Sequence, residues 1–334
     1  MPVRIKDIAE DLGLSPMAVS KALRDHSDIG METKARVVKR AAELNYRMDW
    51  VARSMKTGRT YLVGLVIPDL MQSFFAEIAT ALTARLGAAG YHLVISHSGE
   101  SAPTEVTNID ILCSRKVDGL IIASAQRSAK AFRDLKIPYV LIDRQIPGLD
   151  ANYVGTKNED IGYLASSHLI EQGCRRVAHL KGPGLSTAAG RLRGYRRALA
   201  RHKISAPEDL ILEAGHEDAS GYLVMQQLLK SRPRPDGVFC FNDPVAVGAM
   251  RAILEAGLSI PKDIAVIGAA NMHYSDLLRI PLSTVDQGTR EMGERAAALL
   301  LGCMTVKKPL PPRQVMVSPR LIVRASSLRR ADSP

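Results

Sequence analysis

One short segment near the N-terminus carries polar and apolar side chains at helical spacing. Ser15 followed by Pro16 is typical of a helix start, because serine caps the first turn and proline fits the first helical position. Met17 and Lys21 lie one turn apart and therefore share one face of that helix. A lysine can donate hydrogen bonds to guanine O6 and N7, and an apolar methionine suits a thymine methyl group. The pattern predicts a helix that enters the major groove of DNA with an outer face of Met17, Ser20, Lys21 and Arg24.

Two further helices are needed to hold this face. Before the Ser15 helix, apolar residues recur at helical spacing and predict a first helix. Gly13 follows them and supplies the backbone freedom for a tight turn. A third helix is predicted over residues 32–44. The alternative is a plain helical hairpin whose charges are simply solvated. The apolar sides of the three helices are Ile5, Ile8, Ala9 and Leu12, then Val19, Ala22 and Leu23, then Val37, Val38, Ala41 and Leu44.

The charge balance favours a polyanionic partner. The 334 residues carry a formal net charge of +11, and the sequence pI is near 9.6. Nucleic acid is one explanation of this surplus, and solubility alone is another. The chain is long enough for two or three compact units.

The cysteines and the N-terminus indicate a reduced, cytoplasmic protein. The four cysteines are far apart and form no C-x-x-C pair, so neither a zinc site nor a disulfide framework is predicted. The first residues lack the apolar stretch of a secretory signal, and no later apolar run is long enough to span a bilayer. The sequence contains no motif for a cofactor.

After residue 60 the pattern changes to short apolar runs that alternate with helical stretches, which is typical of a parallel α/β sheet. The runs at 117–122 and 235–240 resemble each other, so two similar lobes are predicted unless the likeness is due to chance. The expected strands are 61–67, 92–96, 119–124, 139–142, 177–180, 237–241, 264–267 and 321–323, and the expected helices are 75–89, 161–172, 191–201 and 245–256.

Taken together, these motifs resemble those of the lactose-repressor family, in order and spacing over nearly the whole chain. The headpiece matches at 5–9, 13–23, 44–46 and 51–55. The later matches are Phe74-Phe75-Ala76-Glu77, Val117-Asp118-Gly119-Leu120, Leu141-Ile142-Asp143-Arg144, His168-Leu169-Ile170, Gly190-Arg191-Leu192-Arg193-Gly194-Tyr195, Asn242-Asp243 and Gln287.

The resemblance implies an all-α helix-turn-helix headpiece plus an α/β sensor of two Rossmann-like lobes, of periplasmic-binding-protein-like type I. It implies a headpiece over 1–47, a hinge helix and linker over 48–60, and an effector-binding and dimerisation domain over 61–334. Lobe 1 would comprise about 61–160 and 287–316, and lobe 2 about 161–286 and 317–326. The implied partners are a small-molecule effector, a second copy of the chain and a pseudo-palindromic double-stranded DNA operator, with a tetramer left open.

The resemblance assigns DNA contacts residue by residue. Lys21 stands where relatives commonly carry arginine, and Met55 stands where they carry the leucine that wedges into the minor groove. Met48-Asp49 replaces the usual proline and asparagine before the hinge helix. The alternative is that Trp50, Val51 and Met55 pack against the sensor. The implied base readers are Pro16, Met17 and Lys21, and the implied phosphate or hinge contacts are Ser15, Ser20, Arg24, Thr33, Tyr46, Ala52, Arg53 and Met55.

The resemblance also implies an effector cleft between the lobes. Sugar-binding relatives carry an aspartate where this chain has Ala270, so a hydroxyl anchor is missing. A sugar acid, a sugar phosphate or another carboxylate is then favoured over a neutral sugar. The implied cleft residues are Phe74, Asp143, Arg144, Arg191, His216, Asn242, Asp243 and Gln287.

Two kinds of alternative remain at this point. Arg144 and Arg191 can pair with Asp143, Asp243 or another acid, and His216 can be a packed surface histidine. Other functions need other motifs: the sequence has no phosphate loop, nucleophile elbow, H-E-x-x-H or dinucleotide fingerprint, so catalytic and metal sites are not predicted. A solute receptor shares the sensor fold, but it would lack the headpiece and begin with a signal peptide. The sequence favours a repressor whose operator affinity a small molecule controls.

Overall fold

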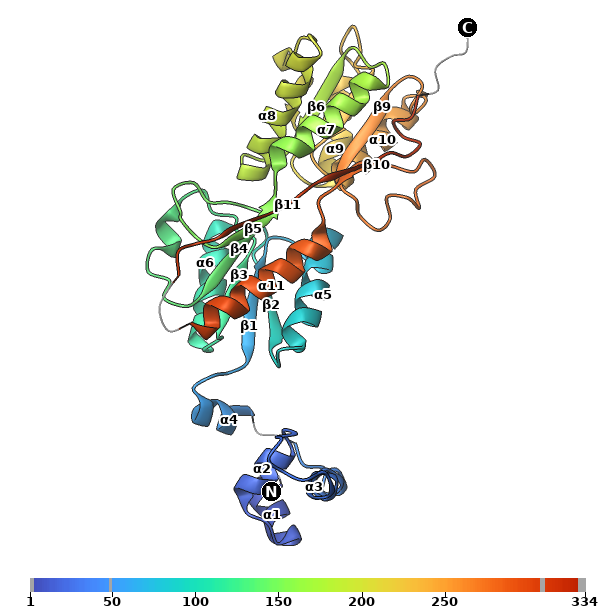
Figure 1. The fold of residues 1–334 in the computed structure, drawn as a ribbon. Coiled ribbons are helices and arrows are strands. Elements are labelled where there is room, and N and C mark those ends of the chain that lie inside the picture. The colour runs from blue at the N-terminus through green and yellow to red at the C-terminus, as the bar shows by residue number, and fades with distance from the viewer. Residues whose placement is uncertain (1–2, 48–49, 307–309, 330–334) are drawn as a thin grey trace. The chain divides into compact units, whose positions relative to one another are not determined.

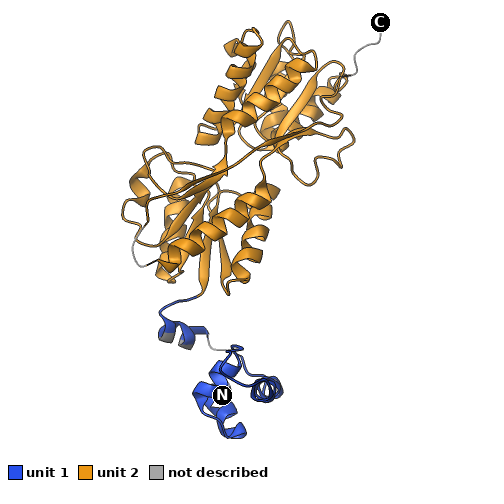
Figure 2. Ribbon diagram, in the orientation of Figure 1, with its two compact units in different colours: residues 1–60 blue, residues 61–334 orange. Residues whose placement is uncertain are grey.

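The computed structural model describes residues 3–47, 50–306 and 310–329. The chain divides into two compact units, Met1–Thr60 and Tyr61–Pro334, which Figure 2 shows in blue and orange. None of the helices in the described ranges is both long and apolar enough to cross a membrane.

In the part of the first unit that the structure describes, the regular secondary structure is helical. Helices α1 (Ile5–Leu12), α2 (Pro16–Ala22) and α3 (Met31–Glu43) enclose a small core of Ile8, Ala9, Val19, Ala22, Val37 and Ala41. Helix α1 ends at Gly13, whose φ of 65° is the left-handed conformation that glycine adopts without steric cost. The unit also contains α4 (Trp50–Thr57).

The second unit contains two six-stranded sheets, and each sheet defines one lobe (Figure 1). In lobe 1 the strand order is β11-β5-β4-β3-β1-β2 and the pairs are parallel; in lobe 2 it is β12-β10-β9-β8-β6-β7, where only β12 pairs antiparallel. Lobe 1 uses β1 (Leu62–Ile67), β2 (His92–His97), β3 (Gly119–Ile122), β4 (Tyr139–Ile142), β5 (Tyr153–Thr156) and β11 (Gln314–Val317). Lobe 2 uses β6 (Val177–Lys181), β7 (Ile211–Glu213), β8 (Gly237–Cys240), β9 (Ala265–Ala270), β10 (Ser283–Asp286) and β12 (Arg320–Ile322).

Helices cover these sheets because central strands such as β3 and β9 are apolar and buried along their whole length. In lobe 1, α5 packs against α11, and in lobe 2, α7 packs against α8 and α9 against α10. The helices of lobe 1 are α5 (Ser73–Gly87), α6 (Ala102–Ser114) and α11 (Thr289–Thr305), with the 3-10 turn η1 (Ala129–Phe132). Those of lobe 2 are α7 (Asn158–Glu171), α8 (Ser186–Arg201), α9 (Asp218–Leu228) and α10 (Asp243–Glu255), with η2 (Glu208–Leu210).

The chain passes between the lobes after β5, after β10 and between β11 and β12. Each of the eight expected strands overlaps an observed strand, and the two-lobed parallel α/β architecture is confirmed. Four strands were not expected, namely β5, β7, β10 and β11. They have only three or four residues, and β10 contains serine, threonine and aspartate, so they lack the apolar run that identifies a buried strand.

Candidate functional site

The three base-reading candidates lie on α2, and the local sequence determines where this helix begins. The Ser15 Oγ accepts a hydrogen bond from the Ala18 amide at 3.1 Å and caps the helix, and Pro16 occupies its first turn. Val19 is fully buried, so the opposite face must point outward, and Met17 on that face is 63% exposed. The helix therefore presents an apolar side chain and a cation at its surface.

The polar groups of this face have partners within the first unit. The Lys21 Nζ donates a hydrogen bond to the Asp28 carboxylate, which His26 also contacts. The Arg24 Nε donates to the Ser20 carbonyl at 3.0 Å, and the Arg24 side chain is exposed. Of the remaining phosphate candidates, Thr33 is partly exposed and Tyr46 packs against the helical core.

The hinge candidates lie on α4. The Met55 side chain is 83% exposed, and the Arg53 guanidinium lies 4.8 Å from the centre of the Trp50 ring. Ala52 belongs to the same helix. Met48 and Asp49, which depart from the family pattern, lie outside the described residues.

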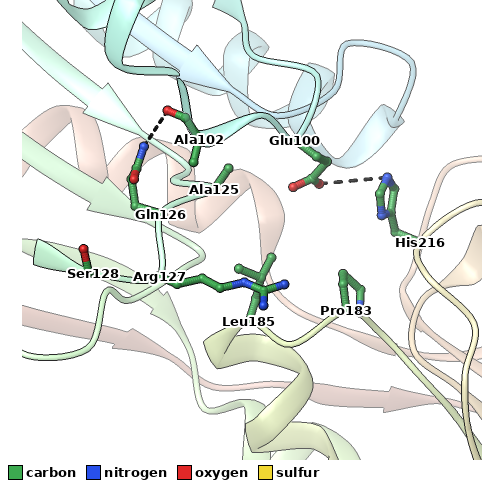
Figure 3. Close-up of a pocket in the computed structure, with 9 residues that line it drawn as sticks. All are labelled: Glu100, Ala102, Ala125, Gln126, Arg127, Ser128, Pro183, Leu185 and His216. Atoms are coloured by element: carbon green, nitrogen blue, oxygen red, sulfur yellow. Dashed lines mark hydrogen bonds and ion pairs between the residues drawn. The ribbon is translucent and has the colours of Figure 1, made fainter. Parts of the chain in front are cut away.

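In the second unit, a cavity of about 480 Å³ lies where residues of both lobes meet. Figure 3 shows its lining, including the contact of Glu100 with His216 and the hydrogen bond from Gln126 to the Ala102 carbonyl. Its volume falls within the range of small-molecule pockets. Lobe 1 contributes Glu100, Ala102, Ala125, Gln126, Arg127 and Ser128, and lobe 2 contributes Pro183, Leu185 and His216.

Arg144 pairs with an acid that lines this cavity. Its Nη1 and Nη2 donate to Glu100 Oε2 and Oε1, each at 2.7 Å, in a bidentate ion pair. Burial opposes ionisation of Glu100, but the hydrogen bonds and charge of Arg144 outweigh it, so the pKa of Glu100 lies below its usual value. Asp143 lies 3.7 Å from the Arg144 Nε, and burial raises the pKa of Asp143. The sequence left open whether Arg144 binds the effector or pairs with an acid. In the structure it pairs with Glu100.

Arg191 lies in a buried polar cluster outside the lining of this cavity. Its guanidinium donates to the Asn158 Oδ1 at 3.1 Å, to the Gln287 Oε1 at 3.0 Å and to the Phe241 carbonyl. Burial lowers the pKa of Arg191 to about 10. All three acceptors are neutral and take three of the five N–H donors, while the charges of Asp143 and Asp243 favour the protonated form of Arg191 without a hydrogen bond to it among the residues that the structure describes.

Close helix packing holds Arg191 in this position. A Cβ on Gly162 of α7 would lie 2.0 Å from the carbonyl oxygen of Arg191 on α8, which only glycine avoids. The Gly-x-x-x-Gly spacing around Arg191 on α8 provides the matching small surface, because Gly190 and Gly194 meet residues 158–163. The family landmark Gly-Arg-Leu-Arg-Gly-Tyr is thus a helix contact as well as a donor of hydrogen bonds.

Asp243 and Asn242 hold the start of α10. The Asp243 carboxylate is fully buried and accepts from the Thr284 Oγ1 at 2.6 Å, the Ser275 Oγ at 2.8 Å and the Met272 amide at 2.9 Å. Asn242 caps α10 and also donates to the His216 carbonyl at 2.9 Å. These contacts position the loop that carries His216.

Of the eight effector candidates, His216 is the one among the lining residues of this cavity, and the other seven are buried and outside its lining. Phe74, for example, packs in the core of lobe 1. Sequence reasoning missed Glu100, Gln126 and Arg127. They follow β2 and β3, and residues at the carboxyl ends of parallel strands are where ligands of such sheets bind. That rule could have found them.

Two family models match the chain. Residues 4–49 match the bacterial regulatory proteins of the lacI family, and residues 166–327 match a periplasmic binding protein-like domain. The repressor PurR of Vibrio atlanticus is 33% identical over 303 residues, which cover 89% of this chain and 90% of the relative. The ribose operon repressor of Halalkalibacterium halodurans is 30% identical and covers 97% of this chain and 96% of the relative.

Solved structures agree. The lac repressor dimer bound to operator and the anti-inducer ONPF superposes with a TM-score of 0.86 at 27% identity, covering 98% of this chain and all of that one. The regulator CelR in complex with cellobiose gives a TM-score of 0.74 at 26% identity, covering 97% and 99%. The match at residues 4–49 separates the chain from solute receptors and enzymes. The chain therefore belongs to the lactose-repressor family of DNA-binding transcription regulators.

Proposed function

We propose that the chain is a cytoplasmic repressor whose headpiece reads an operator and whose second unit binds a small effector that controls operator affinity. The observation that carries the proposal is that one chain joins an outward-facing recognition helix to a cavity lined by two lobes. Neither feature alone needs the other, but a ligand-controlled regulator needs both.

The α2 face supports the DNA contacts. Exposed Met17 and the Lys21 ammonium suit base edges in the major groove, with Pro16 beside them at the helix start. Ser15, Ser20, Arg24, Thr33 and Tyr46 then contact phosphates and fix the register. Met55 is the minor-groove wedge, with Ala52 and Arg53 on the same helix.

The cavity supports effector control. A ligand that touches both lobes favours one arrangement of the lobes over the other by its differential affinity for the two. The coupling between the two sites is reciprocal. If the effector changes the affinity for operator by some factor, the operator changes the affinity for effector by the same factor. In this proposal His216 contacts the effector, while Phe74, Asp143, Arg144, Arg191, Asn242, Asp243 and Gln287 position the cavity wall or join the site when the lobes move.

A second copy of the chain completes the proposed regulator. Two identical headpieces related by twofold symmetry would read a pseudo-palindromic operator, with half-sites about one helical turn apart. Two hinge helices would meet over its centre.

Operator selection tests the proposal. Purified full-length protein is titrated into labelled promoter DNA from beside its own gene and into a shuffled sequence of equal composition, at several salt concentrations. We expect roughly 10³-fold or tighter preference for a pseudo-palindromic site, because base contacts add to the phosphate contacts common to both DNAs. Equal binding to both DNAs would contradict the function.

A further inference from the structure

Arg127 presents a guanidinium to the cavity that no other described residue neutralises. It lies on the loop after β3 in lobe 1, and its side chain is exposed. Within the described ranges it has neither a hydrogen-bond nor an ion-pair partner. Its Nη1 and Nη2 lie 3.9 Å from the position that a Cβ on Gly184 of lobe 2 would occupy. Figure 3 shows the side chain extending toward Leu185.

The two arginines that the sequence assigned to the effector are buried and hydrogen-bonded. Arg144 is paired with Glu100, and Arg191 is buried outside the cavity lining, where it donates to Asn158 and Gln287. The Nε2 of His216 lies 4.0 Å from the Oε1 of Glu100 and 3.9 Å from the Oε1 of Glu217. Among the lining residues, the positive charge that remains available to a ligand is therefore the guanidinium of Arg127.

The loop that carries Arg127 is held in place by a buried carboxyl group. Glu105 on α6 is fully buried, and it accepts from the Ser124 Oγ at 2.6 Å and from the Ala125 amide at 2.5 Å. The Gln126 side chain donates to the Ala102 carbonyl at 2.7 Å. A loop fixed in this way loses little further conformational entropy when a ligand binds.

We propose that Arg127 binds the anionic group of the effector, so that the effector is a small carboxylate or phosphate compound. The planar guanidinium can donate two parallel hydrogen bonds to either group. An anion held there lies between lobe 1 and the Gly184 loop of lobe 2, so it contacts both lobes. This inference rests on the proposed function, and it moves the charge recognition from Arg144 and Arg191 to a residue that no sequence motif marks.

The test uses matched pairs of probes that differ in charge. The pairs are glucose 6-phosphate with glucose, glucuronate with glucose, gluconate with glucitol, succinate with succinamide, and inorganic phosphate with chloride at equal ionic strength. Thermal shift and calorimetry of the full chain measure binding, because a ligand of the native state raises the midpoint. The variants are Arg127→Gln and Arg127→Lys, and the matched control is Arg133→Gln, an exposed arginine outside the cavity lining.

We expect at least one acidic probe to bind wild type and Arg133→Gln more tightly than its neutral counterpart. Arg127→Gln should lose about 10- to 100-fold in affinity for that acid, as expected for a lost charge-assisted pair. Arg127→Lys should recover part of the loss, because it keeps the charge without the planar fork. A response to inorganic phosphate alone would identify a phosphate subsite, whereas a response to carboxylates alone would identify an acid of that class.

Any other pattern overturns the inference: no acid bound in preference to its neutral counterpart, or acids bound equally by wild type and Arg127→Gln. Operator titration of wild type and Arg133→Gln is run in parallel. Operator preference without an Arg127-dependent acid response removes the inference and leaves the proposed function standing. Absence of operator preference removes the proposed function, whatever the acids do.

Discussion

Arg144 and Glu100 form a bidentate ion pair with both N–O distances at 2.7 Å, and it joins the loops after β4 and β2 at the wall of the cavity. The pair neutralises an arginine that sequence position alone assigns to the ligand. Because the Arg144 side chain is 8% exposed and that of Glu100 is 21% exposed, the pair is largely shielded from water. The pair therefore fixes the two loops of the cavity wall to each other.

Glu100→Gln should lower the free energy of unfolding by about 2 kcal/mol, because it removes the bidentate carboxylate from the buried Arg144 guanidinium and leaves it only the more distant Asp143 as an acid within 4 Å among the described residues. The partial exposure of Glu100 keeps this below the range for fully buried pairs. Glu100→Gln combined with Arg144→Met should be less destabilising than the sum of the single changes. Urea unfolding of the four proteins of this cycle measures the coupling, and additive effects would show that the pair contributes nothing.

The fold was largely predictable from the sequence, since apolar runs and helical spacing identified the sheets and their covering helices. Local signals failed where they were weak. Helix α8 was expected to begin at Arg191, but it begins at Ser186, where Leu185 supplies no side-chain cap. The edge strand β7 has only three residues.

The cavity was harder to predict, because its lining depends on pairings between distant residues. Nothing near Arg144 in the sequence indicates that Glu100, 44 positions away, neutralises it. Nor does any local pattern reveal that Glu105 fixes the loop of Arg127. These relationships follow only from the order of the strands in the sheet, which brings the loops after β2, β3 and β4 together.

The buried His179 should make stability depend on pH. Its Nδ1 donates to the Phe239 carbonyl at 3.0 Å, its ring stacks on Phe239, and its Nε2 is buried without a partner in the described part of the chain. Burial lowers the pKa of His179 to about 4. The unfolded chain therefore takes up a proton at a higher pH than the native state, and stability is lost as the pH falls from about 6.5 toward 4.

His179→Phe removes this titration and keeps the aromatic stacking. Between pH 7 and pH 5, wild type should lose about 2 kcal/mol of unfolding free energy relative to His179→Phe. Urea unfolding followed by circular dichroism at each pH measures the difference. Parallel pH profiles for the two proteins would show that His179 is not kept neutral by burial.

Lys21→Ala should cost roughly 1 to 3 kcal/mol on the specific operator and relax selection at one symmetric base pair. In the free protein the Lys21 ammonium is bound by Asp28, so it must exchange this partner for guanine acceptors. Lys39→Ala on α3 is the control, because its exposed side chain lies outside the α2 face. Selection of binding sites from random DNA is the measurement. If Lys21→Ala selects the wild-type sequence at every position, Lys21 does not read a base.

Trp50 is the only tryptophan of the chain, and the Arg53 guanidinium lies 4.8 Å from the centre of its ring. If α4 engages the operator, Arg53 is drawn toward phosphates and the surroundings of the indole change. Specific operator should therefore alter tryptophan emission, and nonspecific DNA at equal occupancy should alter it much less, because an unkinked duplex gives the hinge helices no site.

Met55→Ala should reduce this emission change and weaken operator binding by about tenfold, equivalent to about 1.4 kcal/mol. The 83% exposed Met55 side chain is the apolar wedge for the minor groove, whereas nonspecific binding depends on phosphate contacts that the change leaves in place. Met71→Ala removes a methionine of the second unit that is 92% exposed, and it should affect neither measurement. If Trp50 responds identically to both DNAs, or Met55→Ala binds operator as tightly as wild type, then α4 does not insert into the minor groove, and its apolar side chains serve packing within the protein.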